Sequence, residues 1–93
     1  KEGESRAAFL VRGIVIGVRV KTEEGELGVV RFVDLPQGFE SESVWCGIEL
    51  DRPRGTGDGM FQSQGESARC FVCLPNHGIF VRDPLSLHVV DDV

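Results

Sequence analysis

The spacing of apolar residues constrains the fold of this chain more than any other feature of its sequence. Apolar residues alternate with other residues over short runs, and no window shows a sustained i, i+3, i+4 apolar pattern. Gly and Pro interrupt the sequence at short intervals, and the 12 glycines are spread along the chain. Short alternating runs are typical of half-buried strands, whereas an amphipathic helix needs the longer period. The pattern therefore predicts strands joined by tight turns.

The first part of the chain contains two such runs. Every second position of residues 14–20 is Ile or Val, which predicts a first strand. Residues 22–26 are predicted to form a polar turn, and Leu27 to Val33 to return as the second strand of a hairpin. Residues 34–43, which include Pro36 and Gly38, are predicted to be a loop.

The run from Val44 to Leu50 separates two faces most clearly. Four apolar residues share one face of the predicted strand: Val44, Cys46, Ile48 and Leu50. Because this face must be the core, Trp45, the only Trp in the chain, is predicted to project away from it. A large aromatic side chain on the polar face is a better binding candidate than an aliphatic one.

The second part of the chain alternates loops with short strands. Residues 51–65 are predicted to be long and irregular, and Arg69 to Leu74 to form a buried strand. A turn over residues 75–78 precedes a short strand, Ile79 to Arg82, in which Phe80 and Arg82 point outward together. After Pro84 the sheet is expected to finish with three apolar residues: Leu85, Leu87 and Val89.

These elements predict an all-β fold, a small and strongly curved antiparallel sheet or open barrel with little or no helix. The 93 residues suffice for one domain and are too few for two. We place the domain at residues 14–90, after a flexible segment of residues 1–13 that could add one strand. Residues 91–93 are the C-terminal end. The chain has no signal-peptide pattern and no initiator Met, so we expect it to be a piece of a larger protein.

Charge and hydropathy narrow the range of partners. The formal net charge is −5, whereas a general nucleic-acid binder needs a basic surface. The most apolar stretch, Phe9 to Val20, is interrupted by Arg and Gly residues and is too short to span a membrane. We therefore expect a protein or peptide partner, with no nucleic acid and no membrane.

The three cysteines do not predict a metal site. Cys70, Cys73 and His77 could be read as part of a zinc site, but zinc motifs normally pair two such clusters. In a strand, Cys70 and Cys73 would also point to opposite faces. With Cys46 they are expected to be small apolar residues in a reducing compartment, and no metal or cofactor is predicted.

No catalytic grouping is evident either. Catalysis would need a nucleophile or metal with an oriented base in one cleft, and neither His77 nor His88 is spaced for such a grouping. Glu49 and Asp51 share a strand face, which is better explained as a solvated strand edge. The sequence therefore predicts a chain that is not an enzyme.

Several blocks of the sequence, in this order, resemble the CAP-Gly domain family. They are Gly28-Val29-Val30-Arg31-Phe32, Trp45-Cys46-Gly47-Ile48-Glu49-Leu50-Asp51, Pro53-Arg54-Gly55-Thr56-Gly57-Asp58-Gly59, Phe71-Val72-Cys73 and His77-Gly78-Ile79-Phe80-Val81-Arg82. The resemblance covers roughly residues 14–90. It implies a small β-rich module of cytoskeletal or signalling proteins, located in the cytoplasm and possibly on the cytoskeleton.

The resemblance also implies a binding site. CAP-Gly domains hold acidic C-terminal tails that end in Glu-Glu-Tyr or Glu-Glu-Phe in an aromatic groove, as found in tubulin, end-binding proteins and cytoplasmic linker proteins. By position, Trp45, Phe80 and Arg82 correspond to groove residues of the family. Alternation places the same three side chains outside the core.

The glycine loop departs from the family pattern. The family usually has Gly-Lys-Asn-Asp-Gly, whereas Thr56 and Gly57 stand at the Lys and Asn positions here. We expect Thr56 and Gly57 to contact the peptide. Gly55, Asp58 and Gly59 are expected to shape the loop, with the Asp58 carboxylate capping backbone N–H groups.

Other positions differ as well. Cys70 replaces a family aromatic, and residues 62–68 exceed the common spacing. Phe39 lies one place from a family groove aromatic and is expected to contact the peptide. Arg54, with Arg52, flanks the loop and could restore the missing positive charge, so Arg54 is also expected to contact the peptide. Two functions follow: a module that binds acidic C-terminal tails, or a CAP-Gly module with a changed ligand, as in the cylindromatosis-type deubiquitinase.

Overall fold

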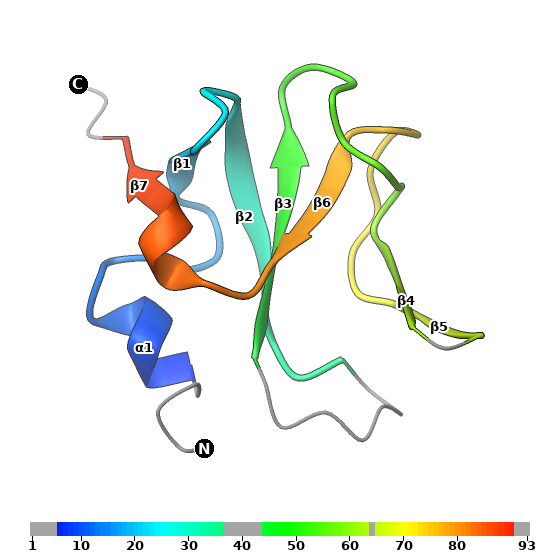
Figure 1. The fold of residues 1–93 in the computed structure, drawn as a ribbon, viewed down its shortest axis with the longest axis horizontal. Coiled ribbons are helices and arrows are strands. Elements are labelled where there is room, and N and C mark those ends of the chain that lie inside the picture. Colours follow the sequence, from blue (N-terminus) through cyan, green and yellow to red (C-terminus); the bar gives the residue numbers. More distant parts are fainter. Residues whose placement is uncertain (1–5, 37–43, 64, 91–93) are drawn as a thin grey trace.

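The computed structural model describes residues 6–36, 44–63 and 65–90, and these residues fold as one five-stranded antiparallel sheet with a separate hairpin (Figure 1). The order of the large sheet is β6-β3-β2-β1-β7. Its strands are β1 (Arg19–Thr22), β2 (Leu27–Asp34), β3 (Trp45–Leu50), β6 (Gly78–Val81) and β7 (Leu87–Val89). The prediction of an all-β antiparallel fold is confirmed.

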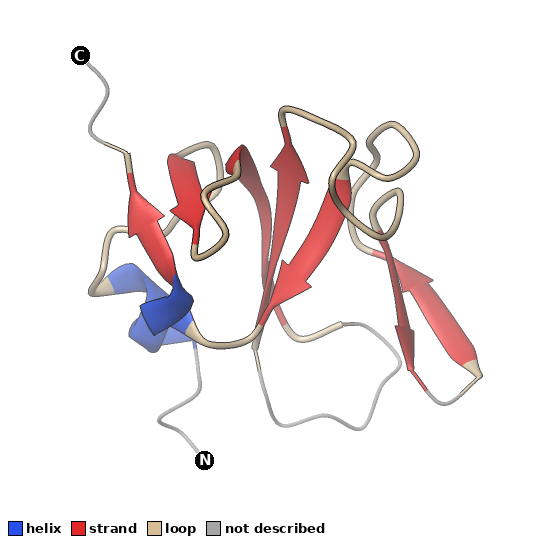
Figure 2. Ribbon diagram, turned by 45° about the horizontal axis from the view of Figure 1, so that its top comes forward, coloured by secondary structure: helices blue, strands red, loops and turns tan. Residues whose placement is uncertain are grey.

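The hairpin consists of β4 (Met60–Ser63) and β5 (Glu66–Arg69), which pair only with each other in the described sheets. It projects from the side of the large sheet nearest β6, as Figure 2 shows. The helical elements are short: α1 (Arg6–Leu10) and the 3-10 turn η2 (Pro84–Ser86). Both lie at the end of the molecule away from the hairpin (Figures 1 and 2).

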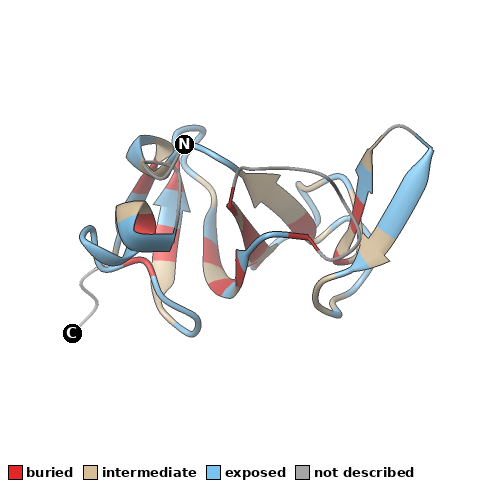
Figure 3. Cartoon of the chain, turned by 90° about the horizontal axis from the view of Figure 1, so that it is seen from below, coloured by how far each residue is buried: buried red, intermediate tan, exposed pale blue. Residues whose placement is uncertain are grey.

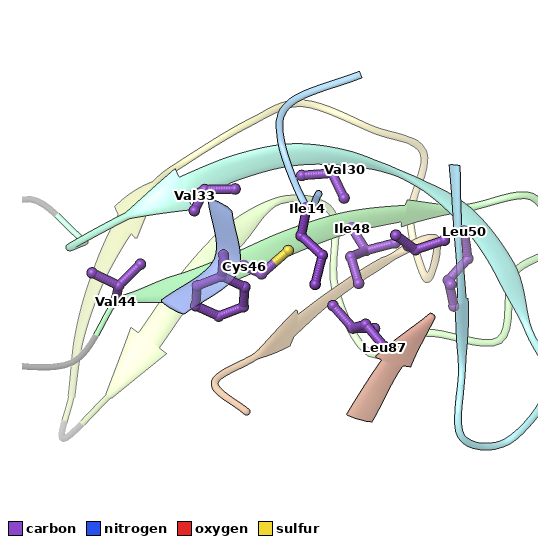
Figure 4. Close-up of a cluster of buried hydrophobic side chains, with 10 residues drawn as sticks. Ile14, Val30, Val33, Val44, Cys46, Ile48, Leu50 and Leu87 are labelled. Carbon is purple, nitrogen blue, oxygen red and sulfur yellow. The ribbon is translucent and has the colours of Figure 1, made fainter. Parts of the chain in front are cut away.

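The core lies against one face of the large sheet. β3 buries the apolar positions that the sequence predicts, and in β2 the alternation of buried residues shifts by one place at an irregularity between Val30 and Phe32. Figure 4 shows these side chains gathered between the strands and the N-terminal segment. Cys46 is fully buried among them, and burial raises the pKa of its thiol to about 12. The core contains Phe9, Ile14, Val20, Val30, Val33, Val44, Cys46, Ile48, Leu50 and Leu87.

The N-terminal segment differs from the prediction. Where the sequence predicted a flexible segment that could add one strand, residues 6–10 form α1, and Phe9 is only 1% exposed in the core. The first strand begins at Arg19, not at Ile14. Gly13 and Gly17 have φ of +79° and +98°, which are incompatible with an extended strand. As a result Ile16 is 64% exposed, although the alternation would place it in the core.

The second half contains two further differences. Residues 69–74 were expected to form a buried strand, but the strands are β4 and β5, and Val72 is 75% exposed. The hairpin turns at Gly65, whose φ of +82° favours Gly. Leu85 is exposed in η2 and Val89 is exposed in β7, so Leu87 alone of the three C-terminal apolar residues joins the core.

Candidate functional site

A groove of about 500 Å³ lies between the large sheet and the β4–β5 hairpin. Figure 3, in which the chain is coloured by burial, shows that the hairpin stands apart from the sheet and is largely exposed. Residues from β3, β4, β6 and the glycine loop line the groove: Trp45, Thr56, Gly57, Asp58, Met60, Phe61, Gln62, Ser63, Gly78 and Phe80. Trp45, Thr56, Gly57 and Phe80 were predicted peptide contacts, and the structure brings these four together.

Aromatic side chains form the wall of this groove. Phe61 lies between Trp45 and Phe80, with ring centroids 5.0 Å and 5.2 Å away. Phe80 also contacts Phe71 at 5.6 Å and Phe32 at 6.4 Å. The tilted and edge-on arrangements are the ones that aromatic quadrupoles favour. Trp45, Phe61 and Phe80 line the groove, and Phe32 and Phe71 pack behind them against Phe80. We call this cluster of five rings the aromatic wall: Phe32, Trp45, Phe61, Phe71 and Phe80.

The alternation of β3 and β6 places the aromatic wall opposite the core. Cys46 and Ile48 are buried on the core face of β3, so Trp45 and Gly47 fall on the groove face. Gly47 must be Gly, because a Cβ there would come within 2.5 Å of Phe71 Cε1. The missing side chain lets the Phe71 ring lie directly on the sheet.

The glycine loop is tied to the edge of β6. Gly57 and Gly78 exchange two backbone hydrogen bonds, of 2.9 Å from Gly78 N and 3.1 Å from Gly57 N. Gly55 approaches the same strand so closely that a Cβ would lie 2.5 Å from Gly78 O. Gly59 has φ +101°, and a Cβ there would collide with the carbonyl of Phe71. The loop therefore passes close to β6 at Gly55 and close to Phe71 at Gly59, where a side chain would not fit.

Asp58 acts differently from the prediction. Within the described residues its carboxylate accepts a hydrogen bond from Arg69 Nη2 at 3.4 Å, and it caps none of the loop N–H groups. The Asp58 carbonyl accepts from Arg69 Nη1 at 3.0 Å and from Cys73 N–H at 3.3 Å. Asp58 therefore joins the loop to β5 and to the segment that follows it.

The arginines divide into paired and unpaired groups. Arg82 lies over the Trp45 ring, 5.6 Å from its centroid, a distance typical of cation–π contact. Arg54, a predicted peptide contact, lies outside the residues that line the groove and instead approaches Glu26, with 3.9 Å between Nε and Oε2. Arg52 binds the same carboxylate at 3.2 Å. These two arginines therefore do not restore charge to the groove.

The two acids Glu49, in β3, and Asp51, just after β3, also have partners. Glu49 accepts from Arg31 Nε at 2.9 Å. Asp51 accepts two hydrogen bonds from Arg19, at 2.8 Å and 2.6 Å, and these bonds hold the pKa of the Asp51 carboxyl below its ordinary value. Glu49 thus pairs with an arginine of the adjacent strand β2, and Asp51 pairs with an arginine of β1, on the far side of β2.

Within residues 6–36, 44–63 and 65–90, no three His, Cys, Asp or Glu side chains gather in a way that could hold a metal ion. Cys70 and Cys73 are half-buried, and desolvation raises the pKa of both thiols. No helix in this part of the chain is long and apolar enough to cross a membrane.

Sequence reasoning missed part of the site. Phe61, Phe71 and Phe32 belong to the aromatic wall, and none was predicted to bind. The one available signal for β4 was Met60-Phe61, an apolar pair in a segment otherwise poor in apolar residues. The predicted contact Phe39 lies outside the described residues.

Comparisons with known proteins agree with this architecture. The CAP-Gly domain profile matches residues 16–84. The chain is 35% identical over 72 residues to the Restin homolog of Drosophila melanogaster, covering 74% of this chain and 4% of that protein. It is 37% identical over 68 residues to mouse CAP-Gly domain-containing linker protein 3, covering 70% of this chain and 11% of the relative. The chain thus spans a small part of the relatives it matches.

The profile match covers more than half of the chain and includes β2, β3, the glycine loop and β6. It lies inside residues 14–90, the range proposed for the domain from the sequence. The matched range holds the groove and the aromatic wall, and the chain belongs to the CAP-Gly domain family.

Proposed function

We propose that residues 14–90 form a non-catalytic cytoplasmic module that holds the acidic C-terminal tail of a protein partner in the aromatic groove. The tails in question end in Glu-Glu-Tyr or Glu-Glu-Phe, as in tubulin or end-binding proteins. The observation that carries this proposal is the aromatic wall with Arg82 stacked on Trp45 at its end. A groove of this kind offers apolar contact for an aromatic residue and a cation for the acids before it.

The charges around the groove support an acidic ligand. Arg52, Arg54 and Arg69 each pair with a carboxylate of this chain. Arg82, by contrast, has no carboxylate partner within the residues that the structure describes. A ligand carboxylate near Trp45 would therefore meet a cation that is not already neutralised.

The glycine loop supplies fewer donors than the family pattern would. The N–H groups of Thr56 and Gly57 both donate to Gly78 O, at 3.0 Å and 3.1 Å. The exposed Thr56 hydroxyl is left to donate to a terminal carboxylate at this end of the groove. Such a contact is a charge-assisted hydrogen bond, which is stronger than a neutral one.

The same loop favours the second candidate function, a CAP-Gly module with a changed ligand. Lys and Asn would contribute a charge and a side-chain amide, and Thr56 with Gly57 contributes neither. Arg54 does not compensate, because it lies with Glu26 away from the groove. An internal segment of a signalling or cytoskeletal protein, without a free carboxylate, would need no such donors.

A fluorescence titration separates the two candidates. Trp45 is the only Trp, so its emission reports directly on the groove. We expect an acidic peptide ending in Glu-Glu-Phe to change this emission and to bind more tightly than the same peptide without its last residue. Equal binding of the two peptides would contradict recognition of the terminal aromatic. Binding of neither would favour the changed ligand.

A further inference from the structure

One edge of β6 borders the groove and does not pair with β3. In an antiparallel ladder, pairs that exchange two hydrogen bonds alternate with pairs that exchange none. Leu50 N–H donates to His77 O at 2.6 Å, and the next residues along the two strands pair as Glu49 with Gly78 and Gly47 with Phe80. The N–H and C=O of Gly78 and Phe80 therefore point away from β3.

The glycine loop covers this edge only at Gly78. Gly57 takes both backbone groups of Gly78, as described above. At Phe80 the two backbone groups have no hydrogen-bond partner within the described parts of the chain. Phe80 also lines the groove, so an unpaired strand edge lies next to the aromatic wall. Unpaired edges are templates for the addition of another strand.

The opposite wall of the groove is also a strand edge. Four consecutive residues, Met60 to Ser63, line the groove, although neighbouring side chains of a strand point to opposite faces. Consecutive residues line one hollow when the strand turns its edge toward it. Cys70 N–H donates to Gly59 O at 3.0 Å, so by the same alternation Met60 and Gln62 direct their backbone groups away from β5.

From these edges we infer that the acidic tail binds in extended form and adds a strand to the large sheet, pairing its main chain with the N–H and C=O of Phe80. This inference rests on the proposed function and specifies how the peptide is held. Main-chain pairing supplies affinity that does not depend on the peptide's side chains. It would therefore offset part of what the glycine loop loses at Thr56 and Gly57.

The direction of the added strand follows from the ends of the groove. Thr56 lies beside the Gly57–Gly78 bridge at one end of the groove, and Arg82 lies over Trp45. The proposed function puts the terminal carboxylate at Thr56 and the preceding acids toward Arg82. β6 runs from Gly78 toward Arg82. The peptide therefore runs antiparallel to β6, and one of its residues exchanges both backbone groups with Phe80.

An ester scan of the peptide tests this pairing. The probe is an eight-residue acidic peptide ending in Glu-Glu-Phe, compared with variants in which one backbone amide at a time is replaced by an ester. An ester removes an N–H donor without adding bulk. We expect one position to lose affinity roughly two- to tenfold, and its immediate neighbours to lose less, because their N–H groups point away from β6.

Amide hydrogen exchange gives an independent readout. At saturating peptide, exchange of the Phe80 N–H should slow at least severalfold, whereas the Val81 N–H, which faces β3 in the ladder, should change little. The pairing would be overturned if the unmodified peptide binds, every ester variant binds with the same affinity, and the exchange rate of the Phe80 N–H does not change. That result would leave the proposed function standing. Slower exchange at Met60 and Gln62 without Phe80 would overturn the assignment to β6. No binding of the unmodified peptide would overturn the proposed function and this inference together.

Discussion

The two faces of β3 and β6 use the same strands for different purposes. On the core face, Cys46 and Ile48 are fully buried, and Ile79 and Val81 pack against them. On the groove face, Trp45 and Phe80 are only half-buried, and their neighbours are aromatic. Because side chains alternate between the two faces, residues on one face of these strands contribute to stability and residues on the other face are available for binding. Substitutions on the two sides should affect different measurements.

The largest expected effect is on the core side. Phe9→Ala should lower the free energy of unfolding by about 3–5 kcal/mol, because it removes a ring that is 1% exposed and leaves a cavity. Chemical denaturation of both proteins measures this difference. Leu10→Ala is the matched control, since Leu10 is exposed in the same helix, and its effect should stay within about 0.5 kcal/mol. A small effect of Phe9→Ala would show that α1 contributes little to the core.

The next effect is on the groove side. Trp45→Ala should weaken binding of the Glu-Glu-Phe peptide by about 2–4 kcal/mol, which is roughly thirtyfold or more. Its cost in unfolding free energy should stay below about 2 kcal/mol, because Trp45 is only half-buried. Calorimetric titration and denaturation measure the two effects. If Trp45→Ala lowered the free energy of unfolding as much as Phe9→Ala does, the two faces would not differ in their contribution to stability.

Restoring the family residues in the glycine loop should strengthen binding of the acidic peptide. Thr56→Lys with Gly57→Asn should raise affinity for the acidic peptide by on the order of 1.5–3 kcal/mol, through a charge-assisted hydrogen bond to the terminal carboxylate. The loop accommodates the change, because φ of Gly57 is not positive and the nearest atom to a Cβ there is Met60 O at 4.0 Å. Gly57→Ala alone is the control and should leave affinity unchanged. A folded double variant with unaltered affinity would mean that the loop does not limit recognition.

The smallest expected effect concerns Arg82. Binding of the acidic peptide should weaken as salt rises, since exposed attractions are screened within about 10 Å at 0.1 M. Arg82→Ala should lower affinity by about 0.5–1 kcal/mol at low salt and flatten that dependence. Arg54→Ala removes the same charge at a site paired with Glu26, and it should leave the slope nearly unchanged. If affinity depends on salt equally in the two variants, the salt effect arises from the net charge of the domain and not from contact between Arg82 and the peptide.

The alternation of the sequence predicts the central strands because each buries one face only. β2, β3 and β6 lie close to their predicted positions, and Trp45, Phe80 and Arg82 fall outside the core as expected. In residues 14–20 the same alternation misleads. The positive φ values of Gly13 and Gly17 cannot be read from apolar spacing.

The hairpin was missed for another physical reason. β4 and β5 have a single buried residue, Phe61, among those whose burial the structure describes, so they carry no apolar alternation. Phe61 joins the site through Trp45 and Phe80, and these contacts arise between segments far apart in the sequence. A local pattern cannot reveal such contacts. In the same way, the sequence suggests that Arg54 is available to bind the peptide, but the fold places Glu26 beside it.

The hairpin's attachment has a consequence for how such a domain can diversify. It shares no strand with the large sheet, and it is held by the Phe61 ring contacts and by the hydrogen bonds of Arg69 to Asp58. No residue of the buried core cluster comes from the hairpin, so insertions and deletions near its turn, at Gly65, should not disturb that cluster. Related domains can therefore differ on one side of the groove while the large sheet and its core stay the same. For the same reason, a hairpin from a relative can be grafted at this position.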